Sequence, residues 1–110
     1  MISSDIIRGH IDTIILKLLS ERDMYGYELA NEIKTRTSNQ FDIKEATLYS
    51  VVQRLESREL ITSYTGAKTH GGQRRYYKIT PLGKAYYRET IAEWEVLQGI
   101  MRAIMGDDIR

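Results

Sequence analysis

Residues 44–79 constrain the fold of this chain most, because a helical pattern there runs directly into two strand patterns. At about 100° per residue, the apolar positions of residues 44–58 fall on one side of a helix: Leu48, Val51, Val52 and Leu55. The other side and its edges carry small or polar side chains: Ala46, Thr47, Tyr49, Ser50, Gln53, Arg54 and Ser57. Such side chains can pair with base edges in the major groove of DNA, although an ordinary amphipathic helix would also show this pattern.

Two runs rich in β-branched and aromatic residues follow, at positions 60–65 and 75–79. They bracket a loop that contains glycines together with Lys68, His70 and Arg74, so we expect a β-hairpin with a basic tip. A helix followed at once by such a hairpin is the arrangement of a winged helix-turn-helix domain. In that fold the helix enters the major groove, and the hairpin contacts the backbone or the adjacent minor groove.

The net charge of +1 hides an uneven distribution along the chain. Residues 44–88 carry nine Lys or Arg against three Asp or Glu, a net charge of +6, whereas the remaining residues carry seven against twelve, a net charge of −5. This asymmetry indicates a polyanion-binding region attached to a mildly acidic body. Chance clustering of solvated charges is the alternative, but the basic part coincides with the hairpin that was predicted on other grounds.

The N-terminal segment predicts one mostly buried helix, from a cap at Ser3 or Ser4 to about Ser20. His10 lies within this helix, and we expect it to be a packing residue because no second ligand stands at metal-binding spacing. The apolar positions follow helical spacing: Ile7, Ile11, Ile14, Ile15 and Leu18.

We interpret residues 21–24 as a polar turn and predict a second helix from Tyr25 to about Lys34. Tyr25 and Gly26 would form the helix entry, where amide donors can meet a phosphate, with a packing role for both as the alternative. A loop over residues 37–42 leads to the helix predicted over residues 44–58, which would be the recognition helix. The side chains expected to face inward are Tyr27, Leu29, Ala30 and Ile33.

A long final helix is predicted after the hairpin, with Thr80 as its cap and Pro81 at its first position. Gly83 leaves room for a neighbour in the first turn. An apolar stripe about 25 Å long, at 1.5 Å per residue, then has little of its own small domain left to cover it. Packing on the first helix can cover part of the stripe, and a second copy of the chain is the natural cover for the rest. The stripe consists of Tyr87, Ile91, Trp94, Leu97, Met101 and Ile104.

The composition argues against several other classes of protein. The chain has 110 residues, which suits one domain, and it has no cysteine, which fits a reducing compartment. No apolar run approaches the roughly 20 residues needed to span a bilayer, and the N-terminus lacks a signal peptide's basic start, so we expect a cytoplasmic protein. Two isolated histidines and unclustered carboxylates predict no enzyme, no metal site and no cofactor.

The order and spacing of several short motifs resemble those of the PadR family of bacterial transcriptional regulators over nearly the whole chain. That resemblance implies a winged-helix DNA-binding domain with a C-terminal dimerisation helix, which usually represses a nearby promoter until an effector lowers operator affinity. The single final helix resembles the small subgroup of the family. The motifs are Tyr25-Gly26-Tyr27-Glu28-Leu29, Thr47-Leu48-Tyr49, Arg54-Leu55-Glu56 and Gln73-Arg74-Arg75-Tyr76-Tyr77-Lys78-Ile79-Thr80-Pro81-Leu82-Gly83-Lys84.

The chain also departs from the family pattern. Ala46 and Ser50 stand where the family often has Gly and Pro, and Glu59 stands where it usually has Gly before the first strand of the hairpin. We therefore expect Glu59 to accept a left-handed conformation at some cost. These departures bear on turn geometry and not on the charge pattern.

In family members that sense small molecules, flat aromatic or drug-like compounds are typical ligands.

We therefore predict a mainly α fold with a β-hairpin: a winged helix-turn-helix DNA-binding domain over residues 1–79 and a dimerisation helix over residues 80–110. The predicted function is sequence-specific transcriptional regulation, as a repressor that binds an inverted-repeat operator as a homodimer. A winged-helix protein-interaction module without DNA binding is the alternative. The residues expected to contact double-stranded DNA are Tyr25, Lys44, Thr47, Tyr49, Ser50, Gln53, Arg54, Lys68, His70, Gln73, Arg74 and Arg75. The residues expected at the dimer interface are Ile7, Ile11, Tyr87, Ile91, Trp94, Leu97, Met101 and Ile104. The candidate contacts for a small aromatic or drug-like effector are Trp94 and Met101.

Overall fold

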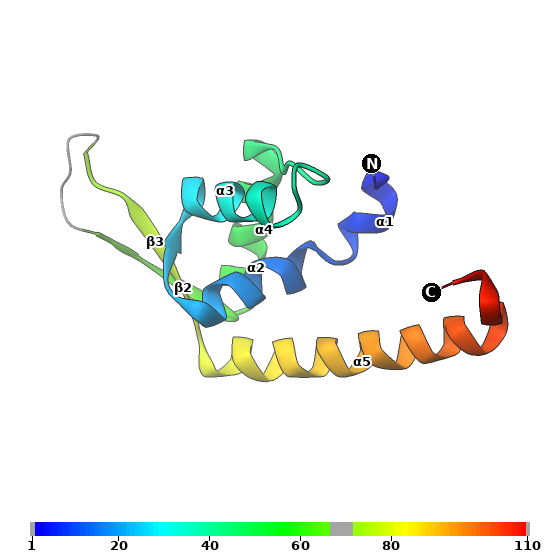
Figure 1. Ribbon diagram of the computed structural model, residues 1–110. Coiled ribbons are helices and arrows are strands. Elements are labelled where there is room, and N and C mark those ends of the chain that lie inside the picture. Colours follow the sequence, from blue (N-terminus) through cyan, green and yellow to red (C-terminus); the bar gives the residue numbers. More distant parts are fainter. Residues whose placement is uncertain (1, 67–71, 110) are drawn as a thin grey trace.

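The computed structural model describes residues 2–66 and 72–109, which form a helical body, a hairpin at one end and a long final helix (Figure 1). The predicted mainly α fold with a β-hairpin is confirmed. In chain order the elements are α1 (Ser4–Arg8), α2 (Ile11–Glu21), β1 (Met24–Tyr25), α3 (Gly26–Arg36), α4 (Glu45–Ser57), β2 (Ile61–Thr65), β3 (Arg75–Ile79), α5 (Pro81–Met105) and a 3₁₀ turn (Gly106–Asp108).

The N-terminal segment is two helices, so the prediction of one continuous helix to Ser20 was wrong. The side chain of Ser3 caps α1 by accepting a hydrogen bond from the amide of Ile6 at 3.3 Å. The helix then ends because the amide of His10 donates to the carbonyl of Ile7 at 2.8 Å, a tight turn around Gly9. Glycine disfavours a helix interior, and the apolar spacing on either side of it concealed the break.

The three strands form one antiparallel sheet in the order β1-β3-β2. Ile61 pairs with Ile79 at one end of the hairpin and Thr65 pairs with Arg75 at the other. β1 was not predicted, because residues 21–24 were interpreted as a polar turn. Met24 instead pairs with Tyr77 and is fully buried. A two-residue strand has no alternation to detect in the sequence, since it exists only through its pairing with β3.

The hydrophobic core lies where α2, α3 and α4 pack against the base of the sheet. Leu29 and Ile33 face this core as predicted, but Tyr27 does not, because 72% of its surface is exposed. Tyr27 lies in the first turn of α3, where its ring contacts that of Tyr25, so helical spacing alone placed it wrongly. The largest fully buried side chains are Ile15, Leu16, Met24, Leu29, Val52, Leu55 and Ile61.

The start of α5 is fixed to the turn between α4 and β2. The hydroxyl of Thr80 accepts from the amide of Gly83 at 2.9 Å and donates to the carbonyl of Glu59 at 2.7 Å. Pro81 is the first residue of the helix, as predicted. Gly83 is buried, and a Cβ atom there would lie 2.0 Å from the carbonyl oxygen of Leu60, so only glycine allows this approach. Glu59 has a φ of 62°, which confirms the predicted left-handed conformation.

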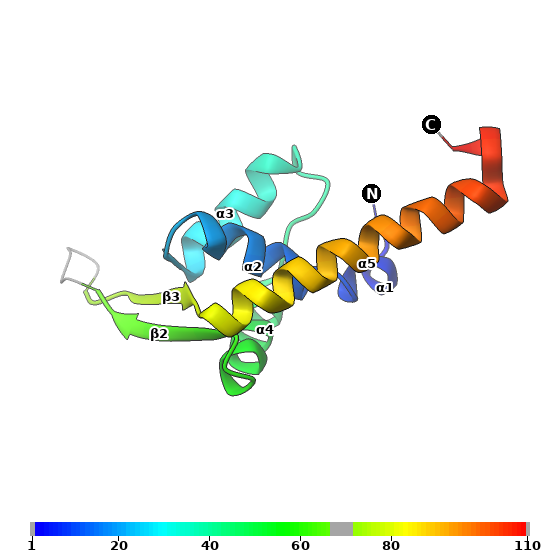
Figure 2. The ribbon, with the colours of Figure 1, turned by 90° about the horizontal axis from the view of Figure 1, so that it is seen from below.

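From this anchor α5 runs beside α2 and continues past the helical body (Figures 1 and 2). Its 25 residues include Gly83 as the one buried position of the helix, and most of its second half is exposed. Within the described parts of the chain, no helix combines the length and apolar character needed to cross a membrane.

Candidate nucleic-acid interface

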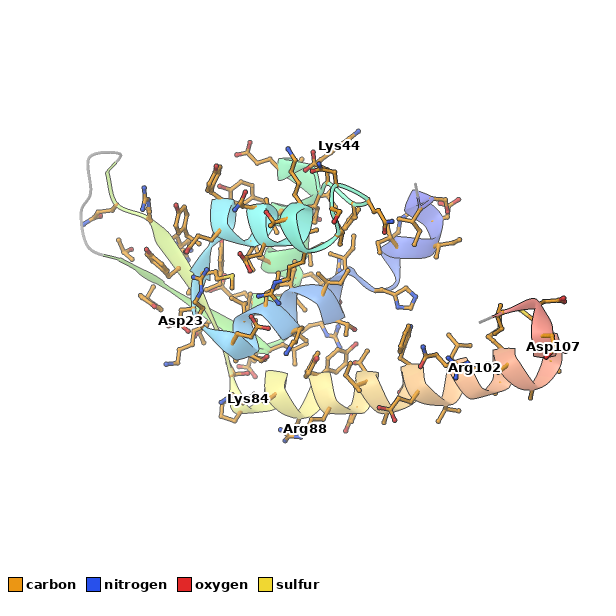
Figure 3. The ribbon with its side chains drawn as sticks, in the orientation of Figure 1. Asp23, Lys44, Lys84, Arg88, Arg102 and Asp107 are labelled. Carbon is orange, nitrogen blue, oxygen red and sulfur yellow. The ribbon has the colours of Figure 1, made fainter. Side chains whose placement is uncertain are left out.

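The two sides of α4 have the surroundings that its sequence predicted. Leu48, Val51, Val52 and Leu55 are buried in the core. On the opposite side Thr47, Ser50 and Gln53 are exposed, and Tyr49 is 48% exposed. Lys44 precedes the helix in an extended conformation, and its side chain points outward on the side of the molecule opposite α5 (Figure 3).

We call residues 61–79 the wing, of which residues 67–71 lie outside the described part. Lys68 and His70, both predicted to contact DNA, are among those residues. Arg75, the first residue of β3, and Gln73, two residues before the strand, are exposed. The guanidinium carbon of Arg74 lies 4.6 Å from the ring centre of Tyr25, a cation-π contact that joins the wing to the start of α3.

A row of tyrosine rings stiffens the junction between β1, the wing and α3. The ring of Tyr25 lies 6.3 Å from that of Tyr27 and 5.5 Å from that of Tyr76, and Tyr76 stacks on Tyr64 at 5.7 Å. The hydroxyl of Tyr64 donates to the carboxylate of Asp23 at 2.6 Å, and this hydrogen bond raises the pKa of Tyr64. Such ring pairs restrict the direction in which the wing leaves the body.

A hollow of about 590 Å³ lies between the start of α3, the start of α4 and β3. It brings together residues that are far apart in the sequence and that were predicted to contact DNA. Its rim therefore presents amide and guanidinium donors beside aromatic rings, a set that can hold a phosphate backbone. The predicted residues that line it are Tyr25, Tyr49, Gln73, Arg74 and Arg75.

A second hollow, of about 340 Å³, lies between α1 and α4 and collects Thr47, Ser50 and Arg54 beside Arg8. Arg54 is not free in this structure, because its Nη2 donates a hydrogen bond to Oδ1 of Asp12 in α2. Arg8 and Asp12 were not predicted to lie at this surface. The contact between α2 and α4 spans 42 positions of the chain, and no local pattern could have revealed it.

Arg58, just after α4, was also not singled out. Its Nη1 lies 3.8 Å from the other carboxylate oxygen of Asp12, and its guanidinium carbon lies 4.8 Å from the ring centre of Tyr86 in α5. The basic residues at the end of α4 are thus held by α2 on one side and by α5 on the other.

The apolar stripe predicted on α5 is largely open to solvent. Trp94, Leu97, Met101 and Ile104 are 46%, 45%, 39% and 81% exposed, although Tyr87 and Ile91 are partly covered. Ile11 is only 5% exposed and belongs to the core of its own chain, so little of its side chain is left to contact a second copy. Ile7 and Ile11 both follow helical spacing, and spacing alone does not show which of the two side chains is buried.

An apolar groove of about 590 Å³ lies between the N-terminal helices and α5. Ile6 and Ile14 line one side, and Tyr87, Ile91 and Trp94 line the other. Met101, which was paired with Trp94 as a candidate effector contact, is not among the residues that line it. In the described residues no cluster of His, Cys, Asp and Glu is suited to a metal ion.

Comparison with known proteins decides the family. Residues 15–89, which run from within α2 through β3 to the start of α5, match the model of the transcriptional regulator PadR-like family. The chain belongs to the PadR-like family. As predicted, this is a family of transcriptional regulators and not of enzymes.

Relatives of this PadR-like chain match over nearly its whole length. An uncharacterized protein of Lysinibacillus sphaericus is 55% identical over 105 residues, which is 96% of each chain. A transcriptional regulator from Clostridium thermocellum is 48% identical, with a TM-score of 0.86 over 94% of this chain and 97% of that one. A PadR family transcription regulator from Clostridium difficile is 36% identical, with a TM-score of 0.79 over 88% and 99%. These likenesses confirm the predicted winged-helix fold.

Proposed function

We propose that this PadR-like regulator binds an inverted-repeat operator as a homodimer and represses transcription from it. In this proposal residues 1–79 bind DNA and residues 80–110 dimerise. The observation that carries the proposal is the position of Arg74, Arg75 and Tyr25 around one hollow beside the exposed polar side of α4. Because promoter DNA is in the cytoplasm of a bacterium, the protein would act there.

Each part of this surface has a different expected role. Thr47, Ser50 and Gln53 have short polar side chains that can contact base edges when α4 enters a major groove. Lys44 would meet a phosphate at the start of the helix, and Arg74 and Arg75 would hold the backbone or enter the adjacent minor groove. The positive charges of Lys44 and the wing therefore supply affinity for DNA, while the polar side of α4 determines the sequence preference.

Dimerisation would cover the apolar stripe of α5. Trp94, Leu97 and Ile104 expose large apolar side chains along one side of the helix, next to the groove that the N-terminal helices form. A second copy related by a two-fold axis can cover the same surface on both chains. The two recognition helices would then meet half-sites about 34 Å apart.

An effector would enter the apolar groove beside Trp94. The groove has about 590 Å³ and is lined by Tyr87, Ile91 and Trp94 on α5, which suits a flat aromatic compound. Titration of candidate aromatic compounds while indole fluorescence is followed tests this part. A broad panel without a response would leave Trp94 as a packing residue only.

The test of DNA binding begins with selection of duplexes from a random library by the purified protein. Selection of one inverted repeat supports the proposal, and retention of no duplex at low salt would favour a protein-interaction module instead. Replacing Arg74 and Arg75 by Ala should weaken binding to all duplexes and reduce the slope of log affinity against log salt by up to about 2. Gln53→Ala should instead relax the sequence preference.

A matched control removes two positive charges elsewhere. Lys84 and Arg88 lie on α5 with their side chains directed away from the helical body (Figure 3). The Lys84→Ala, Arg88→Ala variant has the same net charge as the wing variant. It should keep most of the affinity, and an equal loss in both variants would contradict the assignment of the wing to DNA.

A further inference from the structure

The contact between Asp12 and Arg54 joins the body of the protein to its recognition helix. Asp12 lies in the first turn of α2, and its side chain is only 17% exposed. Arg54 lies on α4 and its side chain is 47% exposed. The carboxylate is thus largely covered, while much of the guanidinium still faces solvent.

The exposed part of Arg54 has a defined orientation. A guanidinium is planar and carries five N–H donors in a fixed fork, so a bond at one edge sets the direction of the others. Nη2 of Arg54 donates to Oδ1 of Asp12. Arg54 also lines the hollow that contains Thr47 and Ser50, on the polar side of α4.

The charge of the pair indicates what Arg54 can contact. Phosphate contacts gain most of their affinity from positive charge, whereas base reading depends on oriented donors. The carboxylate of Asp12, which also lies 3.8 Å from Arg58, offsets the charge of Arg54 and would repel a phosphate that approaches Arg54, so Arg54 with its partner is a poor phosphate site. Its remaining donors suit the two acceptors that guanine presents in the major groove.

We infer that Asp12 is a positioning residue that holds Arg54 in the orientation for reading a guanine base. The inference rests on the proposed DNA binding and deepens it. It makes a residue of α2, outside the recognition helix, a determinant of sequence preference. Asp12 acts through Arg54 and does not itself contact DNA.

Asp12 also lies where an acidic side chain stabilises a helix N-terminus, and that role alone predicts a different result. A purely stabilising Asp12 would affect the melting temperature and would leave the sequence preference unchanged. The preference is therefore the decisive measurement.

The experiment compares selection from a random duplex library by the wild type, Asp12→Asn and Arg54→Ala. We expect both variants to lose preference at the same base pair, with discrimination against a substituted base falling on the order of tenfold. Asp12→Asn should keep or increase its affinity for unselected DNA, because it removes a negative charge.

Asp5→Asn is the matched control. Asp5 pairs with Arg8 at 3.4 Å on α1, so its replacement makes the same change in charge and leaves the bond between Arg54 and Asp12 in place. It should retain the wild-type preference at every position. Loss of the same base preference in Asp5→Asn would overturn the inference, because charge alone would then explain the effect.

Asp12→Glu keeps the negative charge at the helix start and displaces the carboxylate by one methylene group. This variant replaces Asp12→Asn in the experiment if Asp12→Asn does not fold. It should also weaken the preference for that base pair. A folded Asp12→Asn or Asp12→Glu protein that selects the wild-type sequence with unchanged discrimination overturns the inference alone. A wild type that selects no sequence overturns the proposed function and the inference with it.

Discussion

The guanidinium of Arg74 lies 4.6 Å above the ring centre of Tyr25, and this contact joins the wing to the start of α3. Tyr25, in β1, also contacts the ring of Tyr27 in α3 and that of Tyr76 in the wing. One side chain therefore connects β1, α3 and the wing. Tyr25 thus has a structural role in addition to being a candidate phosphate contact.

Tyr25→Leu should lower the affinity for duplex DNA by about two- to fivefold, because an exposed cation-π contact contributes about 0.5–1 kcal/mol. Tyr25→Phe keeps the ring and should retain affinity closer to that of the wild type. Titration of a labelled duplex measures both variants. Equal losses in the two variants would show that the hydroxyl, and not the ring, is important.

Gly83→Ala should destabilise the protein by at least about 1–3 kcal/mol, because the added methyl would overlap the carbonyl of Leu60. Gly99 is the control within the same helix, since nothing lies within 4 Å of a Cβ there. Gly99→Ala should raise stability by roughly 0.5–1 kcal/mol through helix propensity. Urea unfolding of both variants measures the difference, and a tolerated alanine at position 83 would contradict the close approach.

Glu59→Gly should stabilise the protein by up to about 1 kcal/mol, because a residue with a side chain is strained in the left-handed region. Glu59 has a φ of 62° at the end of α4. Glu59→Ala removes the same carboxylate but keeps the strain, so it should give no such gain. Thermal unfolding of the two variants separates backbone strain from charge.

The ion pairs around Glu21 should make stability depend on acid pH. Arg36 donates two hydrogen bonds to Glu21, at 2.9 and 2.5 Å, and these bonds lower the pKa of Glu21 from 4.5 to about 2. A lowered pKa in the folded state means that the contribution is present above pH 4.5 and is lost as pH falls toward 2. The melting temperatures of the wild type and Glu21→Gln should therefore converge over that interval, and a constant difference would contradict this coupling.

Leu97→Glu should convert the proposed homodimer to a monomer, because it places a charge in the middle of the exposed apolar stripe. Glu95→Gln, at an exposed position two residues away, is the control and should leave the dimer intact. Sedimentation of the variants measures the mass. A wild-type protein that is monomeric at micromolar concentration would contradict the proposal directly.

The parts of the structure that could be predicted from the sequence are those that have a local pattern. The buried side of α4, the strands of the wing, the cap at Thr80 and the close approach at Gly83 all follow from spacing or from conformational preference. The strand at Met24 and the exposure of Tyr27 depend on how the sheet packs against α3, which periodicity does not report. The apolar spacing on either side of Gly9 concealed the end of α1.

The candidate site divides in the same way. The residue types of α4 and the wing were enough to predict a basic surface, and the structure places Tyr25, Tyr49 and Arg74 around one hollow. The pairing of Arg54 with Asp12 could not be predicted, since it is formed between two helices distant in the chain. Burial of Ile11 in the core was equally a property of the assembled helices.

A helix held firmly at one end converts a small rotation into a large displacement at the other. α5 is fixed where Gly83 meets Leu60, and its last turns extend beyond the body. At 1.5 Å per residue a helix of 25 residues spans roughly 37 Å, so a tilt of about 5° moves the far end by about 3 Å. In the proposed homodimer, a compound that enters the groove beside Trp94 would therefore change the distance between the two chains without altering the surface of either chain that is proposed to bind DNA.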